Sequence, residues 1–356
     1  YLHGTPFNEI RANNIQVFNM CHSFSKLGVD VTLAIPISTK KENNQIDYIS
    51  QQIGANPGFK VVSYKKITFA GRFQILGNYF GAKSLLREIH TDLCFVRDPL
   101  LLKIAFDAHY PIIFEVHNDN FHTRNKFLSK MWENYVVKIA KNKQVLKFIT
   151  ISEALEKFWK DKGIPEKKII VAHDGFSSYL FQEEREKIEA RTTLSLPENK
   201  KIVLYVGSLY ERRGIDRIIS LAKLFPEALF MVIGGREEQK QYFQKLTDRS
   251  DIKNILWKGF LPHSDIPTYL QAADVLLLLF TWDVPTIRFC SPLKVFEYMA
   301  AGRPIVGEAY PTITEVLEHE YTAFLAEPED FEDLCKNLKK ALSGDGTSEM
   351  ASLARK

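Results

Sequence analysis

Cysteine is scarce in this sequence, and its spacing excludes the usual cysteine-based sites. Only four cysteines occur in 356 residues, and no two of them form a Cys-x-x-Cys pair: Cys21, Cys94, Cys290 and Cys335. A zinc site therefore has no support in the sequence, and a reduced chain is favoured over a disulfide framework. We expect a cytoplasmic protein.

Long apolar runs are also missing. A run such as VLLLLF at 275–280 has the length of a strand and is much shorter than a membrane span. No secretory signal peptide is visible. Both ends are expected to be truncated, because the chain opens on YLHG, as at the end of a strand, and stops at SLARK within an expected helix.

A strong net charge is missing as well. The formal net charge is +4, and the composition of 45% hydrophobic and 25% charged residues is that of an ordinary globular protein. Such a mild positive charge favours anionic partners weakly, among them nucleotides and phospholipid surfaces, and does not require nucleic acid, which we do not expect as a partner. At roughly 150 residues per domain, the length predicts two domains.

Short apolar segments alternate with amphipathic ones along the chain, in two series. The expected strands are 29–36, 60–64, 92–96, 111–117, 147–152, 168–175, 201–208, 228–235, 255–259, 274–280 and 304–308. The expected helices are 11–27, 78–90, 99–108, 124–144, 215–225, 237–247, 266–273 and 292–301. Nearly continuous apolar strands separated by helices indicate parallel sheets covered on both faces. We predict two Rossmann-like, doubly wound α/β domains, residues 1–182 and 183–356, facing across a cleft.

Two glycine-containing loops follow expected strands. The first, HGTPFNEIRANN at 3–14, has Gly4 for a tight turn and a following helix start that could bind an anion, or it is an ordinary connection. The second, VGSLYERRGID at 206–216, places Arg212 and Arg213 beside a helix start near Ile215. Guanidinium groups there suit phosphate oxygens, although two solvated surface arginines remain the alternative.

The segment SPLKVFEYMAAGRP at 291–304 carries one carboxylate, Glu297, in an otherwise apolar helical pattern. The helix is expected to start around Ser291, Pro292 and Leu293, with a capping residue and a first-turn proline. Its free amides could bind phosphate, and a carboxylate one turn further could accept hydrogen bonds from a ribose diol. The alternative is a glutamate paired with a lysine such as Lys294.

A histidine ends one strand of the first series. Alternation places Glu115 and His117 of PIIFEVHNDN (111–120) on one face of that strand. A single histidine at a strand end is more often structural than catalytic, but a place over a cleft would favour function. His173 and Asp174 end another strand and compete for the same role.

The segment 124–147 carries seven basic residues and one acid, Glu133. At about 100° per residue, one helical face gathers Leu128, Trp132, Tyr135 and Ile139, and the other gathers Lys126, Lys130, Lys138 and Lys141. A solvated helix face is the simpler interpretation. Contact with an anionic membrane or a lipid-linked acceptor is the alternative, which would make the protein peripheral on the inner face of the membrane.

Taken together, these segments resemble retaining glycosyltransferases of the GT-B fold, in particular family 4 (group 1 type) and its branch with an SPxKxFEYMAAGxP motif. The resemblance spans nearly the whole chain. It is most specific in VLYVGSLYERRGID, FLPHSDIPTYLQAADVLLLL and SPLKVFEYMAAGRPIVGEAYPTITEVLEHEYTAFLAEPED, and looser in RANNIQVFNMCHSFSKLGVDVTL, FEVHN and TISEALEKFWKDKGIPEKKIIVAHDGF.

The resemblance implies a nucleotide-sugar donor, UDP- or GDP-linked, held mainly by the C-terminal domain, with the acceptor on the N-terminal one. Glu297 matches the second glutamate of the family's pair and would bind the ribose. Arg213 takes the lysine position of the loop from Gly207 to Gly214 and would neutralise the diphosphate. Backbone around Phe260 and Leu261 would contact the base, Gly4 would let its loop approach the phosphates, and His117 would lie near the transferred sugar.

Two positions depart from the family pattern. Phe289 stands where the first glutamate of the pair is expected, so the resemblance does not identify the donor sugar. Ser208 replaces the usual arginine after Gly207, which leaves Arg213, with Arg212, to carry the phosphate charge.

The expected reaction is sugar transfer with retention, without a metal or other cofactor, in the synthesis of a cell-surface polysaccharide or glycolipid. A sugar-nucleotide epimerase, a phosphorylase of the same fold or a non-catalytic nucleotide-sugar-binding subunit are the alternatives.

Overall fold

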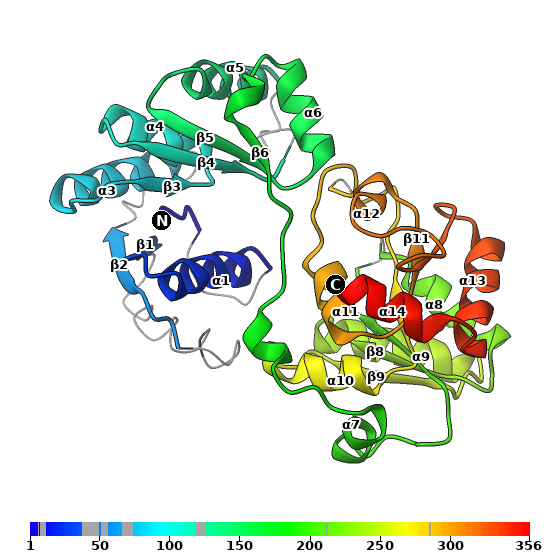
Figure 1. Cartoon of the computed structure of the whole chain (residues 1–356). Helices are drawn as coiled ribbons and strands as arrows, with labels where there is room; N and C mark the ends of the chain where they lie inside the picture. The colour runs from blue at the N-terminus through cyan, green and yellow to red at the C-terminus, as the bar shows by residue number, and fades with distance from the viewer. Residues whose placement is uncertain are drawn as a thin grey trace. The chain divides into compact units, whose positions relative to one another are not determined.

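The computed structural model describes residues 1–5, 7, 12–37, 50, 56–65, 74–118, 126–210, 213–284 and 286–356. Internal packing divides the chain into two units, Tyr1–His173 and Asp174–Lys356. They meet in the chain somewhat before the division between 182 and 183 that the sequence predicted. Each unit is built of parallel strands and helices (Figure 1), so the predicted fold of two doubly wound α/β domains is confirmed.

The first unit contains a parallel sheet in two parts. Its strands are β1 (Thr32–Ile37), β2 (Lys60–Lys65), β3 (Cys94–Val96), β4 (Ile112–Val116), β5 (Val145–Thr150) and β6 (Ile169–Val171). They pair in the orders β1-β2 and β3-β4-β5-β6. Leu2 forms parallel bridges to Ala34 and Val96 and thereby joins the two parts, as expected for the residues of a strand entering the Gly4 turn.

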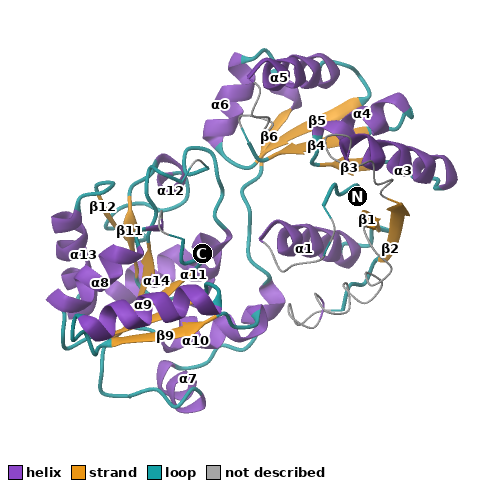
Figure 2. Ribbon diagram, turned by 180° about the vertical axis from the view of Figure 1, so that it is seen from behind, coloured by secondary structure: helices purple, strands orange, loops and turns teal. Residues whose placement is uncertain are grey.

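Helices flank this sheet. They are α1 (Ala12–Lys26), α3 (Gln74–Glu88), α4 (Pro99–Asp107), α5 (Lys126–Ala140) and α6 (Glu153–Asp161), with short 3-10 turns at Glu166–Lys168 and Ser178–Phe181, the second of these in the second unit. Within the first unit, α1 and α5 lie on opposite sides of β3, β4 and β5 (Figure 2). Both sheet faces are therefore covered, which explains why its strands read as continuous apolar runs.

The second unit contains six parallel strands in the order β12-β11-β10-β7-β8-β9. The strands are β7 (Ile202–Val206), β8 (Leu229–Ile233), β9 (Ile255–Gly259), β10 (Val275–Leu278), β11 (Ile305–Glu308) and β12 (Phe324–Ala326). The helices are α7 (Lys187–Thr193), α8 (Ile215–Leu224), α9 (Glu237–Arg249), α10 (Ile266–Ala272), α11 (Leu293–Ala301), α12 (Pro311–Thr314), α13 (Phe331–Ser343) and α14 (Thr347–Arg355), with a 3-10 turn at His263–Asp265.

Alternate residues of each strand in this unit point into two different cores. Ile202 and Leu204 of β7 belong to the core that α10 and α11 cover. Val203 and Tyr205 of the same strand belong to the core that α8 and α13 cover. Successive side chains of a strand alternate between faces, so a strand buried on both faces must be apolar at every position.

The sequence analysis did not predict strand β12 or helices α6, α7, α12 and α13. Strand β12 has only three residues, and α7 lies in the polar stretch 182–200, where its buried residues are Ala190 and Arg191. A buried arginine gives no apolar signal, so the pattern indicated a linker where the structure has a helix.

Two further observations concern what the sequence has little of. All four cysteines are free thiols. Of the helices in the described part of the chain, none has both the length and the apolar character that crossing a membrane requires.

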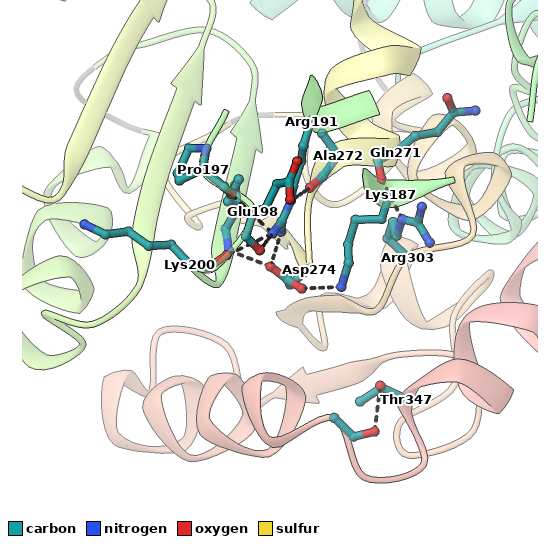
Figure 3. A network of polar contacts seen from close by, with 12 residues as sticks. Lys187, Arg191, Pro197, Glu198, Lys200, Gln271, Ala272, Asp274, Arg303 and Thr347 are labelled. Atoms are coloured by element: carbon teal, nitrogen blue, oxygen red, sulfur yellow. Dashed lines mark hydrogen bonds and ion pairs between the residues drawn. The ribbon is translucent and has the colours of Figure 1, made fainter. Parts of the chain in front are cut away.

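Asp274, just before β10, is the centre of a polar network that anchors α7 to the sheet (Figure 3). One carboxylate oxygen lies 2.5 Å from Arg191 Nη2 and accepts the Ile202 N–H at 2.7 Å, and the other lies 2.8 Å from Lys187 Nζ. Arg191 also donates to the carbonyls of Ala272, Pro197, Glu198 and Lys200. Because both members of the Arg191–Asp274 pair are buried, the loss of one would leave an uncompensated charge.

Asp274→Asn should therefore destabilise the protein by about 3–5 kcal/mol at pH 7, as for other buried pairs that lose one partner. Burial alone would raise the pKa of Asp274, but the hydrogen bonds from Lys187 and Ile202 and the charge of Arg191 hold it below its usual value. The stabilisation is thus present above the unfolded pKa of about 3.9 and is lost as the pH falls through the lower folded pKa. Urea denaturation between pH 3 and pH 7 measures both effects.

Asp251→Asn is the matched control. Asp251 pairs with Lys253, and both side chains are more than 80% exposed, so the same change should cost less than about 1 kcal/mol. Equal free energies of unfolding for the two variants would contradict a stabilising role for the Asp274 network.

Candidate functional site

The turns after β7 and β8 in the second unit come too close together for side chains. A Cβ added to Gly207 would lie 2.8 Å from Tyr205 Oη, and one added to Gly234 would lie 2.1 Å from the Gly207 carbonyl oxygen. Gly207 N–H also donates to the Ile233 carbonyl at 2.9 Å. Gly234 is therefore required sterically, because its added Cβ would meet backbone, and a side chain at Gly207 would displace the buried Tyr205 ring.

The loop after β7 leads to Arg213 and then to helix α8. Gly214 precedes the helix in a left-handed conformation, with φ +70°, and α8 begins at Ile215, as the sequence predicted. The Arg213 N–H donates to the Tyr210 carbonyl at 2.9 Å, and its guanidinium carbon lies 5.8 Å from the centre of the Phe280 ring. Arg212 lies outside the described residues.

A second cation lies against the same ring. Lys294 Nζ is 4.2 Å from the centre of Phe280 and 4.9 Å from that of Tyr205, and it donates to the Leu279 carbonyl at 3.3 Å. Burial lowers the pKa of Lys294 to about 7, and the positive charge of Arg213 adds to that effect. The alternative, an ion pair between Lys294 and Glu297, is not formed. The Lys294 ammonium lies instead against the Phe280 ring, which the Arg213 guanidinium also approaches.

Glu297 bonds to a histidine that the sequence reasoning did not single out. His263 Nε2 lies 2.6 Å from Glu297 Oε1, and both side chains are largely buried. Burial lowers the pKa of His263, but the hydrogen bond and the negative charge of Glu297 outweigh it and raise the pKa above its usual value. The sequence does contain a hint of this contact, because His263 lies in FLPHSDI, three residues after Phe260.

This pair also brings two predicted segments together. Phe260 and Leu261 follow β9 directly, and the His263–Glu297 bond ties the end of that segment to α11. The Phe260 side chain is 57% exposed, whereas Leu261 packs against the core beneath α11. The segment 260–263 therefore begins with the exposed Phe260 ring and ends with His263, which bonds to the largely buried Glu297 carboxylate.

Helix α11 begins differently from the prediction. Its first residue is Leu293, and Pro292 occupies the capping position with no side-chain cap. The expected cap, Ser291, points elsewhere, because its Oγ accepts the Asp174 N–H at 2.8 Å. The prediction of Ser291 as the cap is therefore wrong. No described side chain caps this helix, so the N–H groups of Leu293 and Lys294 are available to an anion.

Tyr298 fixes α11 against the sheet. Its Oη accepts the Val206 N–H at 2.9 Å and lies 3.4 Å from the Leu277 carbonyl. Arg217, which is partly exposed, lies 2.5 Å from Oε1 of the buried Glu308 and donates to the Phe280 carbonyl. These contacts hold Lys294 and the Phe280 ring at the carboxyl ends of β7 and β10, where ligands of parallel sheets bind.

The first unit contains the other predicted residues. A Cβ added to Gly4 would lie 3.5 Å from Asp98, an ordinary contact, so packing does not require glycine there and its predicted approach to phosphate stays a prediction. His117 follows β4, and its Nε2 bonds to Glu115, which confirms that the two share a face. His173 Nδ1 lies 3.1 Å from the Ile151 carbonyl.

Among the residues that the structure describes, no group of three or more His, Cys, Asp or Glu side chains is placed to hold a metal ion.

Comparison with known proteins identifies the family. Residues 186–355 match the family model "Glycosyl transferases group 1", and residues 14–177 match "Glycosyltransferase Family 4". An uncharacterized glycosyltransferase of Haemophilus influenzae is 24% identical over 86% of this chain and 84% of its own length. The putative colanic acid biosynthesis glycosyl transferase WcaI of Escherichia coli is 26% identical over 54% of this chain, which covers 48% of that relative.

Solved structures show the same fold. Anabaena Alr3699/HepE in complex with UDP and glucose matches 99% of this chain and 93% of its own, with a TM-score of 0.73 and 17% identity. Sucrose-phosphate synthase from Thermosynechococcus elongatus matches 99% of this chain and 92% of its own, with a TM-score of 0.75 and 16% identity. Models of glycosyltransferase families match both units of the chain, the group 1 model over the second unit, so this chain is a glycosyltransferase with the GT-B fold.

Proposed function

We propose that this protein transfers a sugar from a nucleoside diphosphate to an acceptor hydroxyl, with retention of anomeric configuration, in the synthesis of a cell-surface polysaccharide or glycolipid. The observation that carries the proposal is the group of side chains around α11: two cations on one aromatic ring, an uncapped helix start and a carboxylate one turn further. That Anabaena Alr3699/HepE binds UDP and glucose supports a donor of this class.

In this reaction the bond between the anomeric carbon and the diphosphate oxygen breaks, and a bond from the same carbon to the acceptor oxygen forms on the same face. The acceptor proton passes to the departing diphosphate, which leaves with the bonding electrons. Negative charge therefore grows on the diphosphate, where preorganised positive groups lower the barrier most. Arg213, the Lys294 ammonium and the N–H groups of Leu293 and Lys294 at the start of α11, which follows Ser291 and Pro292, supply that charge without a metal ion.

The nucleoside would lie beside the His263–Glu297 pair. His263 occupies Glu297 Oε1, and no described residue bonds to Oε2, so the second oxygen can accept a ribose hydroxyl. Backbone around Phe260 and Leu261 would contact the base, and Gly207 and Ser208 would line the phosphates. His117 is assigned to the transferred sugar.

A donor panel tests the proposal. The protein should bind UDP- or GDP-sugars and release the nucleoside diphosphate when a saccharide or lipid-linked acceptor is supplied, with the product linkage in the configuration of the donor. Glu297→Ala should lower nucleotide affinity on the order of tenfold to a hundredfold, because a hydrogen bond to a charged group is lost. Isothermal calorimetry and product analysis by NMR are the measurements.

Glu227→Ala, at an exposed glutamate before β8, is the control and should bind as the wild type does. Donor binding with no turnover on any acceptor would count for a binding subunit instead. A product of inverted configuration would exclude retention, and unchanged affinity in Glu297→Ala would remove the ribose assignment.

Lys294 gives a prediction that depends on pH. Because its pKa is about 7 in the free protein, the ammonium is charged below that pH and neutral above it, so nucleoside diphosphate affinity should fall as the pH rises through 7. Burial is the main cause of that pKa, and the charged or titratable groups that act on it are Arg213, Cys290 and Glu297. Lys294→Met should remove this pH dependence and weaken binding on the order of tenfold at pH 6.

Arg213→Ala should lower kcat by about a hundredfold, the cost of removing one group that stabilises developing charge. Lys339→Met, on the exposed side of α13, removes one positive charge at a site away from the Phe280 ring. It should alter neither kcat nor the affinity for the nucleoside diphosphate. Equal losses in Lys339→Met and Lys294→Met would show a general charge effect and would refute a specific phosphate contact.

Helix α5 supports a contact with an anionic membrane. Its apolar face is buried at Val136 and Ile139, but Leu128, predicted on the same face, is 44% exposed, and so are Phe127 at 71% and Met131 at 53%. Lys130 and Lys138 are exposed beside them. Exposed apolar side chains among lysines suit the surface of a bilayer with anionic lipids; the side chain of Lys126 lies outside the described residues.

Vesicle sedimentation tests this contact. The protein should bind phosphatidylglycerol vesicles more than phosphatidylcholine vesicles, and less so at high salt. The double variant Phe127→Ser, Met131→Ser should bind on the order of a hundredfold more weakly, since each apolar side chain buried in the bilayer contributes about 1.5–3 kcal/mol and about 1.4 kcal/mol is a factor of ten. Ile188→Ser, at an exposed apolar residue of α7, is the control. Equal binding to both lipids, or no loss in the double variant, would contradict the proposal.

A further inference from the structure

A buried carboxylate in the first unit has no part in the chemistry proposed so far. Glu115 in β4 is 3% exposed, and its Oε1 bonds to His117 Nε2 and accepts from Gln16 Nε2 at 3.3 Å. The same oxygen forms an ion pair with Arg97, whose Nε lies 3.3 Å away. Arg97 also donates to Gln16 Oε1, so Arg97, Gln16 and Glu115 form a closed ring of contacts. The ring joins α1 and the ends of β3 and β4.

These contacts determine whether Glu115 is protonated or ionised. Burial alone would raise its pKa, but the hydrogen bond and charge of His117, the charge of Arg97 and the hydrogen bond from Gln16 together hold the pKa below its usual value. Glu115 is therefore a carboxylate at neutral pH. An ionised carboxylate only accepts hydrogen bonds, so the histidine nitrogen that contacts it must carry a proton.

The same contacts determine the form of His117. Burial and the charge of Arg97 lower its pKa, and the Glu115 carboxylate opposes them without cancelling the shift. The His117 imidazole is therefore neutral at pH 7, and its one N–H proton lies on Nε2, against Glu115. The charged or titratable groups that face it are Glu115 and Arg97. Burial, together with the charge of Arg97, also lowers the pKa of His3 to about 4.

It follows that Nδ1 has a free lone pair. No described residue bonds to it, and the His117 side chain is 19% exposed. We propose that Glu115, Arg97 and Gln16 hold His117 as the neutral Nε2–H tautomer, so that Nδ1 accepts a hydrogen bond from a hydroxyl of the bound saccharide. Glu115 is then a positioning residue that acts through His117. The class of ligand rests on the proposed function, whereas the tautomer rests on the contacts alone.

The chemical consequence is that His117 is an acceptor and not a proton donor. Sugar hydroxyls donate as well as accept, so a single acceptor at a fixed position selects one orientation of one hydroxyl. If the proton were on Nδ1, the Nε2 lone pair would face the Glu115 carboxylate, and the two would repel.

NMR of the full chain tests the tautomer directly. With 15N-labelled histidine, the long-range proton–nitrogen spectrum separates the nine histidines, and His117→Asn identifies the signals of His117 by their loss. At pH 7, Nε2 should have the shift of a protonated nitrogen and Nδ1 that of an unprotonated one. A protonated Nδ1, or two averaged shifts, would overturn the proposal.

Glu115→Gln tests the cause. The amide can either accept from or donate to Nε2, so the two nitrogen shifts should move toward each other, and the His117 pKa should fall further because the carboxylate that raises it is gone. Glu133→Gln is the matched control: Glu133 is a partly buried carboxylate of the same unit that contacts Lys130 and Lys162. His117 signals that respond equally to both variants would mean that Glu115 has no specific role.

A pair of substitutions at His117 tests the function of Nδ1 and does not depend on Glu115→Gln folding. The Asn amide reaches the place of Nδ1, and the longer Gln amide reaches that of Nε2. His117→Asn should therefore keep kcat/KM on the order of tenfold above that of His117→Gln, since a hydrogen bond to the substrate is retained. The reverse order would refute the Nδ1 contact. A wild-type protein that turned over no donor would instead defeat the proposed function and leave the NMR result intact.

Discussion

The contact of Tyr298 with two strands is the constraint on which the second unit's site depends. By bonding to Val206 N–H and approaching the Leu277 carbonyl, this buried phenol seats α11 across the carboxyl ends of β7 and β10. That seating puts Lys294 on the Phe280 ring and Glu297 against His263. A helix shifted by one turn, about 5.4 Å, would separate all of these contacts at once. The packing of α11 therefore places Lys294 and Glu297, and the loop before α8 adds Arg213.

Both units contain buried carboxylates that are paired with arginines. Asp274 meets Arg191, Glu308 meets Arg217, and Glu115 meets Arg97. Such pairs stabilise less than apolar packing of equal volume, but the loss of one partner is costly, so they specify an arrangement more than they strengthen it. The Lys294 ammonium is different: its described partners are a carbonyl and two aromatic rings, and the charge that shifts its pKa most is another cation, Arg213. A group so placed is stabilised by an anion, which is what a diphosphate supplies.

Much of the fold and part of the site could be predicted from the sequence. Strands buried on both faces, such as β7 and β10, are apolar at every position, and the helices between them have a clear period, so both βαβ series could be read. Gly207, the start of α8 and the shared face of Glu115 and His117 follow from spacing within a few residues. Ser291 could not be placed the same way, because its hydroxyl bonds to Asp174, more than a hundred residues earlier. For the same reason α7 was missed: its buried Arg191 has partners only in the folded chain.

The sequence by itself thus determined the two α/β series, the turns that require glycine and the candidate cations and carboxylates at strand ends, since all of these depend on neighbours within one or two turns of chain. Only the tertiary structure decided the pairings. Glu297 meets His263 across 34 positions, Arg97 meets Gln16 across 81, and Lys294 lies against Phe280 and Tyr205 instead of its helical neighbour Glu297. A side chain's partner, and with it its protonation state, depends on which distant segments pack beside it, and local periodicity carries no information about that choice.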